Sequence, residues 1–219
     1  MKNKFIFLAT FVAMIALASC GGEQKTTEDT TTVKIDSVKV VTFAGTYNIA
    51  VGQASVKWFG YKVVGDGHDG AITSSTGNLT VVDSKITAGT VTVPVDSITI
   101  GNIPADDKNY KKLLEHLKSP DFLDTKKFPT AVFTLTGVSE KEGKTMIAGN
   151  LQIKDVTKPI EFPATVTVTE TEVSVVSEKI KINRVDFGIK YNEETMTKIV
   201  KEKLIKNEME LQIELKATK

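Results

Sequence analysis

The chain is poor in the side chains that build disulfides, metal sites and arginine clusters. Its 219 residues include one cysteine, one arginine, one tryptophan and 2 histidines. Because the cysteine, Cys20, lies near the start, the rest of the chain holds no disulfide, thiol nucleophile or cysteine-based zinc site. The histidines, His68 and His116, form no H-x-H or H-x-x-x-H pair, and the sequence predicts no metal site. The fold must therefore depend on its apolar core.

The sequence also lacks an excess of charge of one sign. The formal net charge is +1, and residues 21–219 hold 26 basic and 27 acidic side chains. Such a balance offers no electrostatic surface for nucleic acid as a partner. Motifs of catalysis are missing as well, since no P-loop, G-x-S-x-G elbow or H-E-x-x-H occurs. We therefore expect no nucleic-acid partner, no cofactor and no enzymatic activity.

One glycine-rich stretch has the spacing of a nucleotide-binding motif. Gly65 to Gly70 matches the pattern G-x-G-x-x-G, which in dinucleotide-binding proteins leads into a helix. Here the short, β-branched stretch 71–77 follows instead. Asp66 and Asp69 flank His68, but Asp-Gly pairs are ordinary turn chemistry. A glycine-rich hairpin turn is the favoured interpretation, ahead of a nucleotide site or a cation site.

Only one long apolar run is present, from Phe5 to Ala18, and it is interrupted only by Thr10. The alternative of a transmembrane anchor would need about 20 residues. The run follows two lysines and ends in Leu17-Ala18-Ser19-Cys20, a pattern typical of a bacterial lipoprotein signal. We predict a signal peptide over residues 1–19 and an acylated Cys20 as the lipid anchor.

Residues 20–42 are predicted to be the lipidated cysteine and a flexible, threonine-rich tether. Residues 21–32 contain no large apolar side chain and cannot offset the entropy of ordering. In Val33 to Val41, apolar residues alternate with charged ones, so this stretch is either part of the tether or a first strand. The acyl anchor is the only membrane link that we expect. The protein would then lie in the bacterial cell envelope, at the outer membrane, facing the periplasm or the cell surface.

Residues 43–219 are predicted to form one domain, in which apolar and polar residues mostly alternate with period two. The clearest run places Met209, Leu211, Ile213 and Leu215 on one face of a strand. Many strands in hairpin order predict a mainly β fold, either a closed antiparallel barrel or a sandwich. Further runs of this kind cover 46–51, 55–64, 70–76, 78–82, 91–95, 131–138, 145–153, 160–169 and 172–182.

Two segments break the alternation. Residues 105–118 carry Leu113, Leu114 and Leu117 at helical spacing and are followed by Pro120, so we expect a helix there. Residues 193–206 also fit a helix face, with a strand as the alternative. The fold should therefore contain one or two short helices.

Arg184 is the single arginine in a chain that otherwise uses lysine. Its planar guanidinium can bind a carboxylate or a phosphate through two hydrogen bonds. We expect an ion pair with Asp186 or another acid at the barrel rim ahead of a contact with a ligand.

Five stretches together resemble the YceI-like family of lipocalin-like proteins. They cover nearly all of residues 45–215 in the family's order. The stretches are His116-Leu-Lys-Ser-Pro-Asp-Phe-Leu-Asp124 with Lys127-Phe-Pro-Thr-Ala-Val-Phe133; Val56-Lys-Trp-Phe-Gly-Tyr-Lys62 with His68-Asp-Gly70; Gly89 to Ile98; Gly149-Asn-Leu-Gln-Ile-Lys154 with Val156-Thr-Lys-Pro159; and Asn183-Arg-Val-Asp-Phe-Gly-Ile189.

The resemblance implies a single closed antiparallel lipocalin-like β-barrel around an elongated apolar channel, which in relatives holds a polyisoprenoid chain with its polar head near the mouth. The expected function is that of a non-catalytic envelope lipoprotein that binds or carries a polyisoprenoid or a similar long apolar ligand. Candidate ligand contacts are Trp58, Phe133 and Phe162 in the channel and His68, His116 and Arg184 near the head group.

Each of these residues could instead belong to the core or the rim. The alternative is an envelope stress or interaction protein whose barrel is packed solid, without a lipid ligand. Whether the interior is hollow decides between the two, and inward apolar residues suit both.

Overall fold

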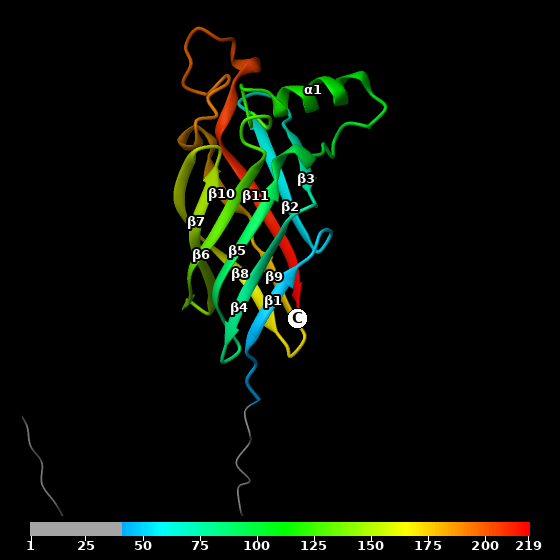
Figure 1. The fold of residues 1–219 in the computed structure, drawn as a ribbon. Helices are drawn as coiled ribbons and strands as arrows, with labels where there is room; N and C mark the ends of the chain where they lie inside the picture. Colours follow the sequence, from blue (N-terminus) through cyan, green and yellow to red (C-terminus); the bar gives the residue numbers. More distant parts are fainter. Residues whose placement is uncertain (1–40) are drawn as a thin grey trace, which may run out of the picture. The chain divides into compact units, whose positions relative to one another are not determined.

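The computed structural model describes residues 41–219, so the predicted signal peptide, Cys20 and most of the predicted tether lie outside the described residues. The described chain is mainly β, with one α-helix beside the barrel (Figure 1). The strands are β1 (Gly45–Ile49), β2 (Ala54–Lys62), β3 (His68–Ile72), β4 (Thr76–Val82), β5 (Lys85–Pro94), β6 (Thr130–Lys141), β7 (Lys144–Ile153), β8 (Val156–Val168), β9 (Glu172–Ser177), β10 (Ile180–Asn183) and β11 (Ile205–Thr218). The helices are α1 (Lys108–Lys118) and the 3-10 turns η1 (Val95–Ser97), η2 (Arg184–Phe187) and η3 (Lys201–Lys203).

All strand pairings in the sheet are antiparallel, and the sheet closes on itself. Three pairs of consecutive strands continue one another along the wall: β1 with β2, β3 with β4, and β9 with β10. The wall therefore has eight strand positions. β11 completes it, with β9 and β10 along one edge and β2 and β1 along the other, where Asn48 pairs with Thr218. The predicted closed antiparallel barrel is confirmed.

The alternating pattern decides which side chains face inward. On β11, Met209, Leu211 and Ile213 pack against the buried core, while Glu208 and Glu214 form ion pairs with lysines of neighbouring strands. Successive side chains of a strand point to opposite faces, so a period of two gives one apolar face and one charged face. This physical rule explains why the strand pattern could be read from the sequence.

The helix α1 is shorter than the predicted 105–118. It begins after Asp107, whose carboxylate accepts a hydrogen bond from the backbone N–H of Asn109 at 2.7 Å. An aspartate that caps a helix start in this way stabilises it by satisfying an unpaired donor. The helix ends before Pro120, and Leu113, Leu114 and Leu117 pack on the cluster around Trp58. It thus lies beside one end of the barrel (Figure 1).

The expected second helix over 193–206 is wrong. Only the 3-10 turn Lys201–Lys203 is helical, and the backbone N–H of Ile205 bonds the carbonyl of Asn192 at 2.8 Å. The segment contains Thr195, Thr197 and the adjacent Ile199 and Val200, whose β-branched side chains lose rotamer freedom in a helix. The end of the segment therefore folds back and forms a hydrogen bond with its start, in place of the hydrogen bonds of a helix.

The glycine-rich stretch 65–70 does form the expected hairpin turn. Gly65 has a φ of +83°, which favours glycine, and the chain resumes as β3 at His68. The strand expected over 70–76 is displaced, because β3 ends at Ile72 and β4 begins at Thr76.

Candidate functional site

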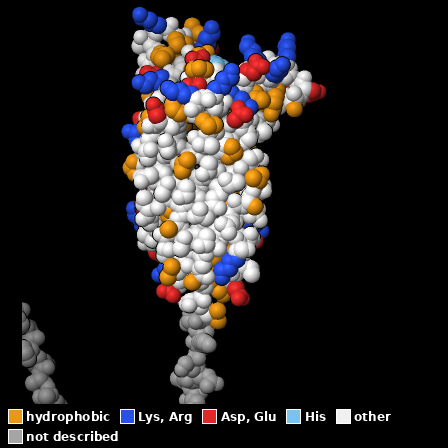
Figure 2. Space-filling view, viewed as in Figure 1, with side chains coloured by type: hydrophobic (Ala, Val, Ile, Leu, Met, Phe, Trp, Pro, Cys, Tyr) orange, Lys and Arg blue, Asp and Glu red, His pale blue; other side chains and the backbone are white. Residues whose placement is uncertain are grey.

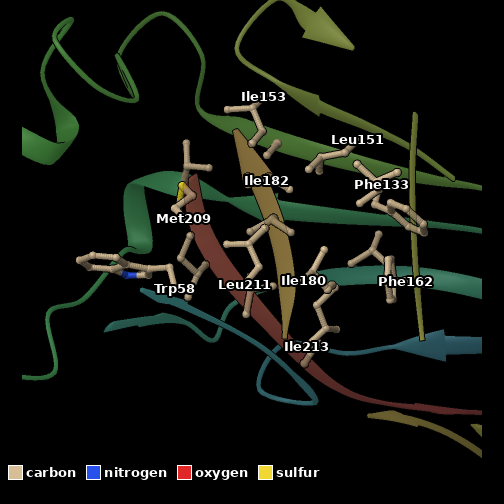
Figure 3. A pocket seen from close by; sticks show the side chains of 18 of the residues that line it. Trp58, Phe133, Leu151, Ile153, Phe162, Ile180, Ile182, Met209, Leu211 and Ile213 are labelled. Carbon is tan, nitrogen blue, oxygen red and sulfur yellow. The ribbon is translucent and has the colours of Figure 1, made fainter. Parts of the chain in front are cut away.

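The interior of the barrel contains an elongated cavity. The space open to the centres of water-sized spheres is ≈ 220 Å³. Aliphatic and aromatic side chains and glycines from most of the strands line it, and of the lining residues within 41–219 only Arg184 and Lys206 carry a charge. Figure 3 shows side chains from different strands, among them Trp58, Phe162 and Leu211, directed toward the same space. The barrel is therefore hollow, whereas the packed alternative requires a filled interior.

One end of the barrel is closed by its own core. Tyr47, Val81, Val173 and Ala217 are at most 1% exposed, and none of them lines the cavity. The Tyr47 hydroxyl donates to the carbonyl of Thr169 at 2.7 Å and fixes the ring in place. This end also carries the first described residues and the end of β11 (Figure 1). A ligand that enters the cavity must come from elsewhere.

The other end, which we call the mouth, lies beneath α1 and the segment 188–204. Leu117, Phe122 and Ile205 line the cavity there and are only half-buried. Three rings connect α1 to the far side of this end. The ring of His116 lies edge-on to those of Phe122 and Tyr191, with centroids 4.9 and 4.6 Å away. The mouth therefore has aromatic side chains on its rim.

The aromatic residues predicted for the channel all line the cavity. Trp58 is anchored near the mouth, because its indole N–H donates to the carbonyl of Thr99 at 3.2 Å. Phe133 and Phe162 lie deeper, with ring centroids 5.8 Å apart. A side chain at Gly149 would collide with the Phe133 ring, so this glycine makes room for it. The family resemblance predicts these three positions as ligand contacts, and the structure places all three on the cavity wall.

Arg184 also lines the cavity, yet the expected ion pair with Asp186 does not form. Its Nη1, Nη2 and Nε donate to the backbone carbonyls of Ile189, Ile205 and Lys206 at 2.8, 3.0 and 3.0 Å. Asp186 instead accepts from the side chain of Asn183. Since η2 turns the chain back through Gly188, three carbonyls surround the guanidinium more closely than any carboxylate does.

Burial lowers the pKa of the Arg184 guanidinium from its ordinary value, and the negative charges of Glu193 and Glu194 act in the opposite direction. The group stays protonated, since an arginine in a protein does not lose its charge at neutral pH. It joins the two ends of the segment 189–206 at the mouth.

The two histidines do not line the cavity. His68 begins β3 and faces the side-chain oxygen of Asn102 at 3.3 Å. His116 lies on α1, with its Nε2 3.1 Å from a carboxylate oxygen of Asp121. Among residues 41–219 no group of three or more His, Cys, Asp or Glu side chains could hold a metal ion. Both histidines thus lie at the mouth end, His68 beside the β2–β3 hairpin and His116 on α1.

Several lining residues had no individual signal in the sequence. Ile180 and Ile182 come from β10, and Phe122 comes from the loop after α1. Gly60 continues the inward face of β2 beyond Trp58 and leaves open space, since a Cβ there would have no neighbour closer than 3.9 Å. The two-residue spacing from Trp58 could have identified Gly60 as an inward position.

A closed barrel with an apolar cavity, a solid floor and one mouth defines the class of lipocalin-like binding barrels. Within that class, the model of the YceI-like domain matches residues 40–217, and the chain belongs to this family. No helix among residues 41–219 has the length and apolar character needed to cross a membrane.

Known relatives and structures agree with this assignment. A UPF0312 protein of Shewanella denitrificans is 34% identical over 113 residues, which cover 51% of this chain and 54% of the relative. One of Vibrio vulnificus is 34% identical over 110 residues, covering 50% and 53%. The chain thus spans about half the length of the curated relatives it matches.

Two solved structures share the fold. BcnA of Burkholderia cenocepacia superposes with a TM-score of 0.61 at 19% identity, covering 78% of this chain and 99% of that one. A polyisoprenoid binding domain from Saccharophagus degradans, implicated in plant cell wall breakdown, gives 0.58 at 11% identity, covering 78% and 97%.

Proposed function

We propose that the barrel binds a single long apolar chain, a polyisoprenoid or a similar molecule, and carries it without chemical change. The observation that supports this most directly is the almost wholly apolar cavity with one mouth. A pocket of this lining gains affinity from burial of apolar surface and offers few polar groups for catalysis. The polyisoprenoid-binding domain with the same fold makes this ligand class the first to test.

The dimensions suit one chain. Lining residues on β11 run from Ile205 to Leu215, about 33 Å along an extended strand. With the usual tilt of barrel strands, this corresponds to about 25 Å along the axis. A cavity of ≈ 220 Å³ drawn out to that length is a tube only about 3 Å in radius, if a water-sized sphere of about 1.4 Å is added to the space for its centre. A methyl-branched chain fits such a tube, whereas two chains side by side do not.

The affinity should depend on chain length. Each CH₂ group removed from water contributes about 0.8 kcal/mol, so about 20 carbons contribute about 16 kcal/mol. The loss of translational and rotational freedom on association opposes binding by about 4–15 kcal/mol. Micromolar affinity or better, which corresponds to about 8 kcal/mol, is reached only by long chains. A short-chain analogue should show no measurable binding.

Trp58 supplies the assay, because the chain's only tryptophan lines the cavity. The delipidated protein is titrated with a long isoprenoid quinone and a short-chain quinone while indole fluorescence is followed. Native preparations are extracted with organic solvent and analysed by mass spectrometry. If the long quinone binds no better than the short one and no apolar molecule is extracted, the proposal is wrong.

Gly60→Leu tests whether the cavity itself is the binding site. A leucine at Gly60 would project into open space beside Trp58, so the fold should remain stable while affinity falls at least tenfold. Gly137→Leu is the matched control, because a side chain at Gly137 meets nothing within 4 Å and Gly137 does not line the cavity. Equal affinity of both variants and the wild type would contradict binding inside the barrel.

The acyl anchor at Cys20 is part of the same proposal. It would attach the carrier to the bacterial cell envelope, at the outer membrane, through lipid alone. The support is the sequence pattern around Cys20, and the test of acylation is given in the Discussion.

A further inference from the structure

The mouth end of the barrel carries a local concentration of lysine. Residues 41–219 hold 23 basic and 23 acidic side chains, so any positive surface must arise from their distribution. The segment 196–206 contains four lysines and one glutamate. Lys198, Lys201 and Lys203 are exposed, and within the described chain none lies within 4 Å of a carboxylate. These three positive charges face solvent without a partner.

Apolar side chains lie among these lysines. Val200, between Lys198 and Lys201, is 59% exposed, and Ile199 is half-buried. Val63 and Val64 lie beside them and are exposed as well, because the backbone N–H of Val63 donates to the carbonyl of Leu204 at 3.0 Å. We call the exposed group formed by residues 63–64 and 198–203 the mouth tip.

A second basic group lies on α1, at the same end. Lys108, Lys111 and Lys112 are exposed, and among the described residues they form no ion pair. Figure 2 shows lysine side chains projecting at this end in both places, with carboxylates among them and at the outer edge of the α1 projection. The mouth therefore lies between two projections that carry exposed lysines, one of which also exposes valines.

We propose that the mouth end docks on a membrane surface that contains anionic phospholipids. Lysines beside an apolar surface favour such an interface, since the charges attract anionic head groups and the apolar side chains enter the boundary of the acyl chains. Nucleic acid or an acidic protein would use the lysines but would leave the exposed valines in water. The combination favours a lipid surface.

The purpose of docking rests on the proposed function. With the mouth against the bilayer, an apolar chain could pass between the membrane and the cavity without crossing water. Docking itself needs no ligand, and it can be measured on ligand-free protein.

A fluorescent label on a single cysteine measures docking at a chosen site. Val200→Cys in a Cys20→Ser chain places a nitrobenzoxadiazole label on the mouth tip. Val82→Cys is the matched control, because Val82 is an exposed valine, 48% against 59%, at the tip of the β4–β5 hairpin, which lies at the opposite end (Figure 1). Both chains keep the same N-terminal segment, so its own affinity for lipid affects both samples equally.

Vesicles of phosphatidylcholine with phosphatidylglycerol should raise the fluorescence of the label at 200 and leave the label at 82 unchanged. Vesicles of phosphatidylcholine alone should have little effect on either. High salt should weaken docking, because exposed charges are screened.

Removal of the lysine charges measures how much they contribute to membrane binding. A lysine near an anionic leaflet contributes about a fivefold factor in partitioning, so Lys198→Gln, Lys201→Gln and Lys203→Gln together should reduce it roughly a hundredfold. The control with equal loss of charge is Lys85→Gln, Lys141→Gln and Lys144→Gln, at hairpins of the opposite end, and it should retain docking.

Four results would overturn docking: no response at 200, the same response at 82, the same response to neutral vesicles, or an equal response to double-stranded DNA. The Gly60→Leu chain separates the two proposals. It should dock normally while failing to bind the quinone. In the protein without the Gly60→Leu change, quinone binding without docking would refute this inference alone, and docking without quinone binding would refute the proposed function alone.

Discussion

Arg184 offers the sharpest test of how the mouth is built. Its guanidinium donates to the carbonyls of Ile189, Ile205 and Lys206, which belong to the two ends of the segment that forms one side of the mouth. Arg184→Lys keeps the positive charge but replaces a planar group with five donors by a point charge that cannot reach all three carbonyls. The variant should therefore loosen this segment.

The magnitude follows from the burial of the three bonds. A hydrogen bond from a charged donor contributes about 1.5–3 kcal/mol net. The bond to Ile189 is buried, whereas those to Ile205 and Lys206 are part-buried, so water can replace them in part. With one bond retained by lysine, we expect a loss of about 2–4 kcal/mol in the free energy of unfolding. For a domain of this size, that lowers Tm by about 4–16 °C.

Thermal unfolding and hydrogen exchange measure this effect. Exchange should accelerate first at the amides of residues 189–206. Lys181→Gln is the control, because it removes an exposed positive charge from the neighbouring β10 and should change stability by at most about 0.5 kcal/mol. An Arg184→Lys variant with unchanged Tm and exchange would refute the structural role. If it lost quinone affinity at unchanged stability, Arg184 would be a head-group contact.

Three further predictions concern other parts of the chain. Cys20→Ser should abolish labelling with palmitate in cells, and equal labelling of variant and wild type would refute the acyl anchor. Hydrogen bonds from Lys179 and then Tyr61 lower the pKa of Glu210 below its ordinary value, so its stabilisation is present above pH 4.5 and lost as the pH falls through the lower folded value. The difference in stability between wild type and Glu210→Gln should therefore shrink in urea unfolding at pH 3, and a constant difference would contradict the linkage. Gly70→Ala should destabilise the domain by about 2 kcal/mol or more in the same assay, because its Cβ would collide with the Thr99 carbonyl, and an unchanged midpoint would show that the backbone yields freely.

The mainly β class could be predicted because its signal is local, whereas the choice of a closed barrel over a sandwich depended on the family resemblance. On β11, the alternation of Met209, Leu211 and Ile213 with charged and polar residues determines which face is inward, whatever the partner strand is. The interruptions of the wall could not be read in this way. β1 pairs with β4, whereas β2, which continues β1 along the wall, pairs with β3. This change of partner is required only once the barrel is closed.

The site was predictable in type but not in detail. Trp58, Phe133 and Phe162 were identified through the family resemblance, and all three line the cavity. Arg184 was expected to meet a carboxylate, because arginines usually do, yet the turn at Gly188 brings carbonyls around it instead. Contacts of this kind depend on a loop path that no periodic pattern encodes.

The hollow interior itself argues for a ligand. An apolar cavity reduces stability by about 24 cal/mol per Å³, so ≈ 220 Å³ corresponds to about 5 kcal/mol. This is comparable to the whole free energy of unfolding of a marginally stable domain, about 5–15 kcal/mol. Gly60 at an inward position maintains the space, because a Cβ there would have no neighbour closer than 3.9 Å and a larger apolar side chain would fill it. At the closed end Tyr47 does fill the barrel, so the same architecture permits both outcomes. The cavity lowers the stability of the barrel at one end, whereas the other end is filled by side chains. A long apolar molecule in the cavity would make the van der Waals contacts that the empty space lacks, and this accounts best for the cost.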